Sequence, residues 1–164
     1  MTQPPTMTQK GLTYEEFTPG ETYATARRTI TEGEVMQFVN LVGLMEPLFI
    51  DAEYIRDRTE YGERIAPGSL TFALAEGLTV QTGLIHGTGL AFVGLESMRL
   101  FQPVKVGDTI SVHIEVLDSR KAKSRDAGIV RYRHVVNNQR GEAVMEYTVG
   151  RLIRGRQQAL GNRP

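Results

Sequence analysis

Alternation between apolar and polar side chains in the second half of the chain is the feature that most constrains its fold. Three runs carry it, at Ile110–Val116, Val130–Val136 and Ala143–Val149. Period-two alternation places every second side chain on the same face of a β-strand, so each run predicts a strand with one apolar face. The segments between the runs, Ser119–Gly128 and Asn137–Gly141, contain turn-forming residues. The pattern therefore predicts hairpin-linked strands in an antiparallel sheet, one face of which another element must cover.

Two helices are predicted ahead of these strands. Residues 31–34 (TEGE) have the form of a capping box, and apolar residues follow at helical spacing as far as Gly43. A second helix is expected from Ser69, as its N-cap, to about Thr82. Apolar residues occur nearly all round this second helix, which is typical of a buried helix.

Two more strands are expected, at Thr22–Thr29 and at Leu90–Phe101. The order of strand, helix, irregular segment, buried helix and four strands predicts an α+β fold. In it, an antiparallel sheet wraps around one long central helix. Such a sheet keeps an open edge, which is commonly closed by association with a second copy. We therefore expect a homodimer or a higher homo-oligomer.

Composition narrows the classes of function. The chain has 164 residues, 40% hydrophobic and 23% charged, which fits one soluble domain of ordinary size. Lys+Arg and Asp+Glu number 19 each, so neither nucleic acid nor a membrane is an expected partner. Cysteine is absent and the three histidines have no ligand spacing, so no metal site is expected. We expect a cytoplasmic protein with one domain at 12–154 and disordered tails at 1–11 and 155–164.

Three stretches of the sequence carry a family resemblance. They are residues 38–51 (FVNLVGLMEPLFID), 61–70 (YGERIAPGSL) and 99–109 (RLFQPVKVGDT). Together they resemble the MaoC-like (R)-specific enoyl-CoA hydratases and 3-hydroxyacyl dehydratases, over about Tyr14 to Arg154. The resemblance implies a hotdog fold and a role in fatty acid metabolism on an acyl-CoA or another acyl thioester. It implies no cofactor beyond the coenzyme A of the substrate.

The first stretch departs from the family pattern at the catalytic positions. The family's segment reads glycine, aspartate, any residue, asparagine, proline, an aliphatic residue and histidine. Here Leu44 stands at the aspartate position, Glu46 at the asparagine position and Phe49 at the histidine position. In the family, the aspartate and histidine activate water and move the α-proton of the thioester, and neither leucine nor phenylalanine can transfer a proton. The resemblance therefore implies an atypical site, in which Leu44 and Phe49 line an apolar pocket.

Glu76 and Glu46 are the candidate catalytic residues. Glu76 lies in the middle of the most apolar helix, where burial would raise the pKa of its carboxyl toward the range of a general base. The resemblance places this helix position at the active site. Glu46 lies inside the altered segment, and two close carboxylates could share a proton as acid and base. The alternatives are an ion pair for Glu76, with an arginine at a dimer seam, and a solvated loop position for Glu46.

The turn into the second helix supplies candidate substrate-binding residues, namely Pro67, Gly68 and Ser69. Backbone N–H groups at a helix N-terminus stabilise negative charge, and the resemblance implies an oxyanion hole for the thioester carbonyl at this turn. His86 lies in a glycine-rich loop after the helix and is a candidate for the mouth of the pocket.

Three functions remain open on the sequence. The first is an enoyl-CoA hydratase or 3-hydroxyacyl-CoA dehydratase with an atypical site. The second is an acyl-CoA thioesterase with Glu76 as base or nucleophile, and the third is a non-catalytic protein that binds acyl thioesters. The basic run at 120–125 (RKAKSR) fits either a site for the phosphates of coenzyme A or a solvated hairpin.

Overall fold

The computed structural model describes residues 10–123 and 125–159. The strands are β1 (Thr22–Ala24), β2 (Arg28–Thr29), β3 (Gly89–Leu100), β4 (Thr109–Lys121), β5 (Ala127–Asn137) and β6 (Ala143–Arg154). The helices are the 3-10 helix η1 (Tyr14–Glu16), α1 (Glu32–Val42), α2 (Pro47–Ile50), α3 (Ala52–Arg58), α4 (Gly68–Gln81) and α5 (Arg156–Ala159). The four long strands are confirmed, while the single strand expected at 22–29 is two short ones.

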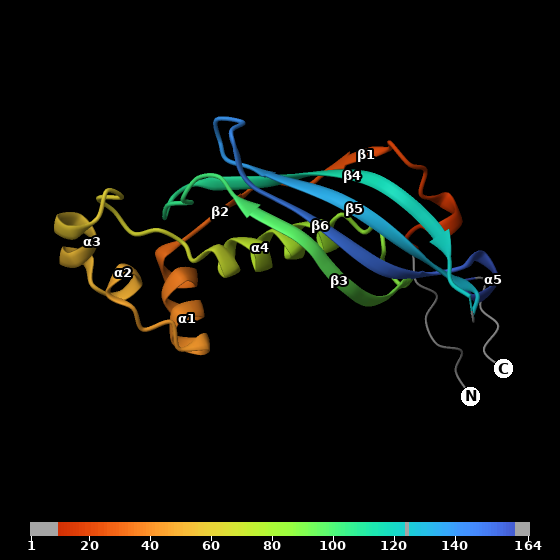
Figure 1. Cartoon of the computed structure of the whole chain (residues 1–164), viewed down its shortest axis with the longest axis horizontal. Coiled ribbons are helices and arrows are strands. Elements are labelled where there is room, and N and C mark those ends of the chain that lie inside the picture. The colour runs from red at the N-terminus through yellow and green to blue at the C-terminus, as the bar shows by residue number, and fades with distance from the viewer. Residues whose placement is uncertain (1–9, 124, 160–164) are drawn as a thin grey trace, which may run out of the picture.

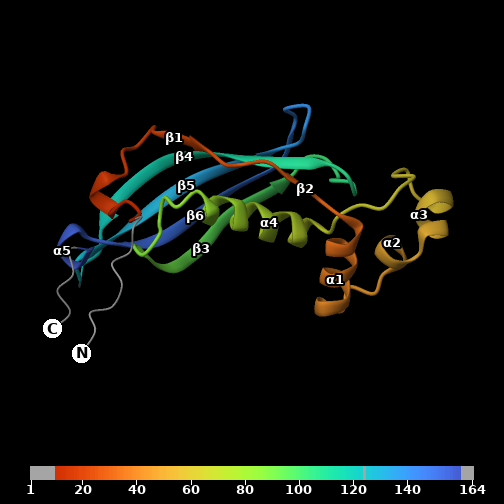
Figure 2. The ribbon, with the colours of Figure 1, turned by 180° about the vertical axis from the view of Figure 1, so that it is seen from behind.

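One antiparallel sheet organises the molecule. Its strand order is β1-β4-β5-β6-β3, and β2 also pairs with β4. The sheet is curved, and α4 runs along its inner face (Figures 1 and 2). Inward side chains of β4, β5 and β6 form the core with the near side of α4, as the alternation predicts. The α+β hotdog architecture expected from the sequence is confirmed.

Helix α4 begins two residues earlier than predicted, because Pro67 rather than Ser69 is its N-cap. The carbonyl of Pro67 already accepts the first helical hydrogen bond, from the Thr71 N–H at 3.0 Å. Ser69 is therefore inside the first turn, where its side chain is exposed. The residues that face the sheet are buried, namely Leu70, Thr71, Ala75, Leu78 and Thr79.

The opposite side of α4 is open. Ser69, Ala73 and Val80 are exposed and Gly77 is half-buried, and their spacing places them along one face of the helix. The expectation of a helix buried all round thus holds only for its sheet-facing side in the single chain. The open side carries small residues, which would allow close approach of another helix.

Helix α1 has the predicted ends. Thr31 Oγ1 accepts from the Glu34 N–H at 3.3 Å, and Glu34 Oε2 accepts from the Thr31 N–H at 2.9 Å, which completes the capping box. Gly43 ends the helix in the left-handed conformation at φ 74°. The segment after it, expected to be irregular, contains the short helices α2 and α3, and α3 is capped by Asp51.

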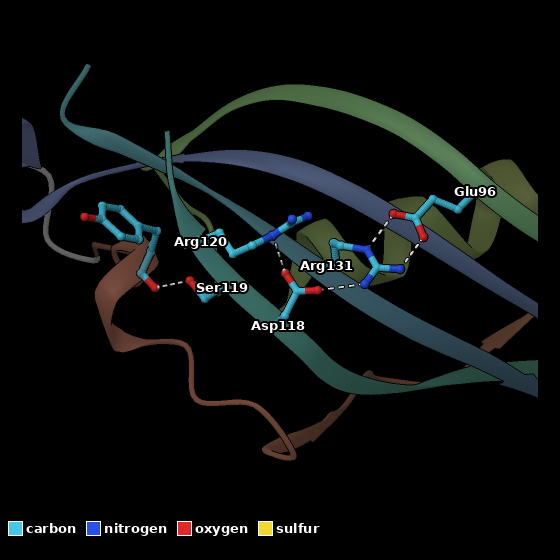
Figure 3. A network of polar contacts seen from close by, with 6 residues as sticks. Glu96, Asp118, Ser119, Arg120 and Arg131 are labelled. Atoms are coloured by element: carbon cyan, nitrogen blue, oxygen red, sulfur yellow. Dashed lines mark hydrogen bonds and ion pairs between the residues drawn. The ribbon is translucent and has the colours of Figure 1, made fainter. Parts of the chain in front are cut away.

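The outer face of the sheet carries ion pairs. Arg131 Nε donates to Glu96 at 2.6 Å and Arg131 Nη1 to Asp118 at 2.7 Å, in the network of Figure 3. Arg133 is held in the same way between two carboxylates, those of Glu115 and Glu146. These charges alternate with the buried side chains of β5, so the face opposite α4 is polar.

Most of the predicted tails, residues 1–9 and 160–164, lie outside the described residues. The inner ends of the two ranges contact the domain, because the Gly11 N–H donates to the His86 carbonyl and the Gly155 N–H to the Asp126 carbonyl, each at 2.8 Å. Among the described helices, none combines the length and the hydropathy needed to cross a membrane.

Candidate functional site

The first candidate cleft lies where α4 begins. Gly68 and Thr71 line it together with Phe49 of α2, Leu100 at the end of β3 and Phe101 just after it, in a volume of about 260 Å³. Pro67 offers no side-chain acceptor to the first N–H groups of α4, which form the positive end of the helix dipole. This space, called the Gly68 cleft below, can stabilise a developing negative charge on a ligand oxygen.

The walls of the Gly68 cleft are mainly apolar. Among the described residues that line it, none has a carboxylate or an imidazole, and only Tyr61 has an ionisable side chain. Phe49 contributes its half-buried ring to the cleft, as the resemblance implies. A Cβ on Gly68 would lie 2.5 Å from Leu100 Cδ2, so the helix start and the edge strand approach closely here. The cleft is therefore mainly apolar, and its described lining residues include no carboxylate–imidazole pair for proton transfer.

The other altered positions lie beside this cleft rather than in it. Leu44 is half-buried and packs against the hydrophobic core. Glu46 is exposed at the N-cap of α2, where its side chain makes no capping hydrogen bond. Within the described chain the two candidate carboxylates, Glu46 and Glu76, make no contact with each other.

Glu76 lies in a polar cluster between α4 and the sheet. Its Oε1 accepts a hydrogen bond of 2.9 Å from the Tyr147 hydroxyl, and its Oε2 accepts one from Arg151 Nη2. His134 Nδ1 lies 3.3 Å from Oε1. The side chains of Glu76 and Arg151 are only 16% and 12% exposed. The ion pair with arginine, one of the two sequence alternatives, is thus present within a single chain.

The cluster sets the charge of its members. Burial raises the pKa of Glu76, but His134, Arg151 and Tyr147 outweigh it and hold that pKa below the usual value. Burial lowers the pKa of His134 in spite of the neighbouring carboxylate, and burial raises the pKa of Tyr147. Near neutral pH the cluster therefore holds an ionised Glu76, a charged Arg151, a neutral His134 and a neutral Tyr147. The expectation of a raised Glu76 pKa is wrong for this chain.

A second cleft lies at the other end of β3. It has a volume of about 360 Å³ and is lined by Val80, Ile85, His86, Leu90, Phe92 and Arg151, together with two glycines and Ala91. It is called the Arg151 cleft below. Its wall includes His86, exposed on the loop after α4, where the sequence places it at a pocket mouth.

Sequence reasoning missed three of the polar residues around Glu76, namely His134, Tyr147 and Arg151. His134 and Tyr147 belong to the inward faces of predicted strands, and the side chain of His134 is only 1% exposed. Extending the alternation of Ala143–Val149 by one step places Arg151 on the same inward face. That extension was the available signal for a partner to Glu76.

A family model for the FAS1-like dehydratase domain region matches residues 18–147. The chain belongs to the MaoC-like dehydratase family. Beta-methylmalyl-CoA dehydratase of Chloroflexus aurantiacus is a relative, 32% identical over 152 residues, which are 91% of this chain and 42% of that protein. Protein MaoC of Klebsiella aerogenes is 35% identical over 101 residues, which are 62% of this chain and 29% of that protein. The chain thus spans less than half the length of these curated relatives.

A solved structure covers the MaoC-like domain at nearly full length. The monoamine oxidase regulatory protein from Archaeoglobus fulgius is 32% identical with a TM-score of 0.83, and the match covers 92% of this chain and 99% of that one. The fold around the Gly68 cleft is therefore the family's fold.

Proposed function

We propose that the protein is an acyl-CoA hydro-lyase of the enoyl-CoA hydratase or 3-hydroxyacyl-CoA dehydratase type. The observation that carries the proposal is the Gly68 cleft, in which uncapped N–H groups of α4 meet apolar walls of acyl size. Family membership supports the reaction class, since relatives carry the names beta-methylmalyl-CoA dehydratase and mesaconyl-CoA hydratase. In hydration, the oxygen of water bonds to Cβ and a proton bonds to Cα. The N–H groups at Gly68 would stabilise the enolate oxygen that forms between these steps.

The protein would act as a homodimer joined along β3. This strand has twelve residues and lies at the sheet edge, paired only with β6 in the described chain. Large apolar side chains are exposed on β3 and just after it, and on α4, namely Val80, Phe92, Val93, Leu95, Leu100 and Phe101. A solved structural relative described as a double hotdog fold is matched over 46% of its length, so two such domains occur there in one chain. Pairing at β3 would also bring the small-residue face of α4 against its copy.

The dimer would complete a site that one chain leaves without proton-transfer groups. In a two-fold antiparallel pairing, the start of one β3 lies beside the end of the other. The end of β3 borders the Gly68 cleft and its start borders the Arg151 cleft. The partner's His86 and the partner's Arg151, which line the Arg151 cleft, would then lie beside the Gly68 cleft, and the partner's Glu76 is hydrogen-bonded to that arginine. Glu76 keeps its candidate role as base, and Pro67 and Ser69 keep theirs in substrate binding.

The test is a paired assay on the purified protein. Crotonyl-CoA and longer 2-enoyl-CoAs are followed by loss of the enoyl absorbance, and free thiol is measured in the same wells. Enoyl loss without thiol release, reduced at least tenfold in Glu76→Gln or His86→Gln, is the expected result. Glu46→Gln serves as the matched carboxylate control, because Glu46 is exposed and makes no contact with Glu76. If Glu46→Gln reduced turnover as much as Glu76→Gln, the catalytic carboxylate would be assigned to the altered segment around Glu46 instead.

A non-catalytic acyl-thioester-binding protein is the second candidate, favoured by Leu44 and Phe49 at the catalytic positions. It predicts neither loss of the enoyl absorbance nor release of thiol, together with binding of a saturated acyl-CoA. Thiol release abolished by Glu76→Gln would instead indicate the thioesterase. The three contacts of Glu76 speak against its use as a nucleophile, because an ion-paired carboxylate with a lowered pKa attacks poorly.

A further inference from the structure

The Arg151 side chain offers hydrogen-bond donors that the described protein does not use. A guanidinium has five N–H groups in a planar fork, and Glu76 takes one of them, at Nη2. Phe92, the cross-strand neighbour of Arg151, covers one face of the group at 5.6 Å. Within the described residues no other acceptor binds this guanidinium. Arg151 is also one of the residues that line the Arg151 cleft.

The lining of this cleft selects for an anion with an apolar body. Its described side chains are apolar apart from Arg151 and His86, and none of them is a carboxylate. A partly buried guanidinium with free donors binds a carboxylate through two parallel hydrogen bonds, and a neutral methyl group would leave those donors unpaired. The chemistry that fits is a carboxylate at the end of a short apolar chain.

The two clefts have complementary positions along β3. The Gly68 cleft includes Leu100 at one end of the strand, and the Arg151 cleft includes Gly89, Leu90 and Phe92 at the other. Antiparallel pairing of two copies reverses one strand against the other, so the Gly68 cleft of one copy adjoins the Arg151 cleft of its partner. One elongated ligand can therefore occupy both.

We propose that Arg151 binds the terminal carboxylate of a dicarboxylic acyl thioester whose carbonyl lies at Gly68 of the other copy. The inference rests on the proposed function, to which it adds the class of acyl group. The substrate is then an enoyl-CoA that ends in a carboxylate, or its 3-hydroxy counterpart. Phe92 covers one face of the guanidinium, and Glu76 fixes its orientation through the hydrogen bond at Nη2.

The test compares two series of substrates on the wild-type dimer. One series consists of trans-2-enedioyl-CoA thioesters with four to ten carbons, and the other of methyl-ended trans-2-enoyl-CoAs of the same lengths. At the best length, kcat/KM is expected to be about 10- to 100-fold higher for the carboxylate-ended thioester, as for a lost hydrogen bond to a charged group. Equal or better turnover of the methyl-ended series overturns the inference and leaves the proposed function intact.

Variants separate a direct contact from a general effect. In Arg151→Gln the ratio of the two kcat/KM values is expected to approach one. Arg133→Gln, on the outer face of the neighbouring strand β5, should keep the wild-type ratio. If Arg151→Gln does not fold, the wild-type ratio still decides the matter.

A further measurement covers the case in which no thioester reacts. That result would overturn the proposed function, and calorimetry with saturated acyl-CoAs then tests Arg151 alone. Tighter binding of adipyl-CoA than of hexanoyl-CoA by wild type, lost in Arg151→Gln, supports the carboxylate site. Equal binding of the two overturns it.

Discussion

Glu76 is the only charged residue on α4, and its partners all come from the sheet. Burying a carboxylate costs free energy unless a positive charge and hydrogen bonds compensate for it. Arg151 supplies the charge and Tyr147 a hydrogen bond from β6. The cluster thus connects the middle of the helix to the strand beside the sheet edge.

A double-mutant cycle would measure this connection. Glu76→Gln is expected to lower the free energy of unfolding by about 3 kcal/mol, since it leaves the Arg151 charge partly buried without its partner. Arg151→Met alone should cost a similar amount, and the double variant much less than the sum. Urea unfolding of the four proteins gives the coupling. If the losses in unfolding free energy simply add, Glu76 and Arg151 contribute to stability independently.

Acid should destabilise the protein in two stages. The pKa values of His134 and Glu76 are both lower in the folded chain, so the unfolded chain binds more protons and stability falls as pH falls. The loss begins below about 6.5, the ordinary value for His134, and steepens below about 4.5, that of Glu76, with at most about 1.4 kcal/mol per pH unit for each group.

The first stage can be assigned with one variant. Unfolding free energies measured from pH 8 to 4 should show no decline between 6.5 and 5 in His134→Asn. The same replacement at His113, which is exposed on β4, should leave the wild-type curve unchanged. A curve of His134→Asn that still matches the wild type would exclude His134 as the cause.

At the residue scale, the sequence singled out Glu76 but did not identify the residues that pair with it. A carboxylate inside an apolar helix is visible as an exception, which is why Glu76 could be singled out. Its partners Tyr147 and Arg151 lie far along the chain, and sequence alone does not specify which strand positions pass beneath the middle of a helix. The direction of the Glu76 pKa shift depended on those partners, so burial alone gave the wrong direction.

At the element scale, helix α1 depends on its capping box. Thr31→Ala should lower the free energy of unfolding by about 1 kcal/mol, the usual contribution of a side-chain N-cap. Thr31 and Glu34 cap each other, so Glu34→Ala added to Thr31→Ala should cost less than it does alone. Chemical denaturation of the three variants checks both statements, and a neutral Thr31→Ala would contradict them.

Element boundaries followed from the sequence where a local signal was strong. The capping box and Gly43 predicted both ends of α1, and alternation predicted β4, β5 and β6. The short helices α2 and α3 were missed, because four to seven residues do not establish a helical period. The N-cap of α4 was placed at Ser69 since serine is a common cap, whereas the extended backbone of Pro67 made it the boundary.

At the scale of the whole molecule, the mass in solution should be twice 18.3 kDa. Val93 is 53% exposed on β3. A charge there would oppose edge pairing, so Val93→Glu should give a monomer by light scattering and lose turnover with it. Thr22→Glu, on the far edge strand β1, should remain a dimer. A dimeric Val93→Glu would exclude the β3 edge as the interface.

The fold class was accessible from the sequence because the alternating strands and the single long helix leave few ways to bury one apolar face. The candidate site was less accessible, since Gly68 lies near one end of β3 and Arg151 and Phe92 lie near the other, and only the proposed pairing of two chains would bring them together. The family resemblance around Leu44 and Phe49 pointed to the region of α2 as the site. The charged pair of Glu76 and Arg151 lies instead between α4 and the sheet.

The two edges of the sheet are unequal, and this limits how many copies can join. At one edge β1 and β2 have three and two residues, too short to template another sheet. At the other edge β3 offers twelve. If copies pair through β3 as proposed, each chain has one such edge to offer, so association would stop at two copies instead of continuing as a ribbon. Both composite sites of the proposed dimer would then form together, when the two chains pair.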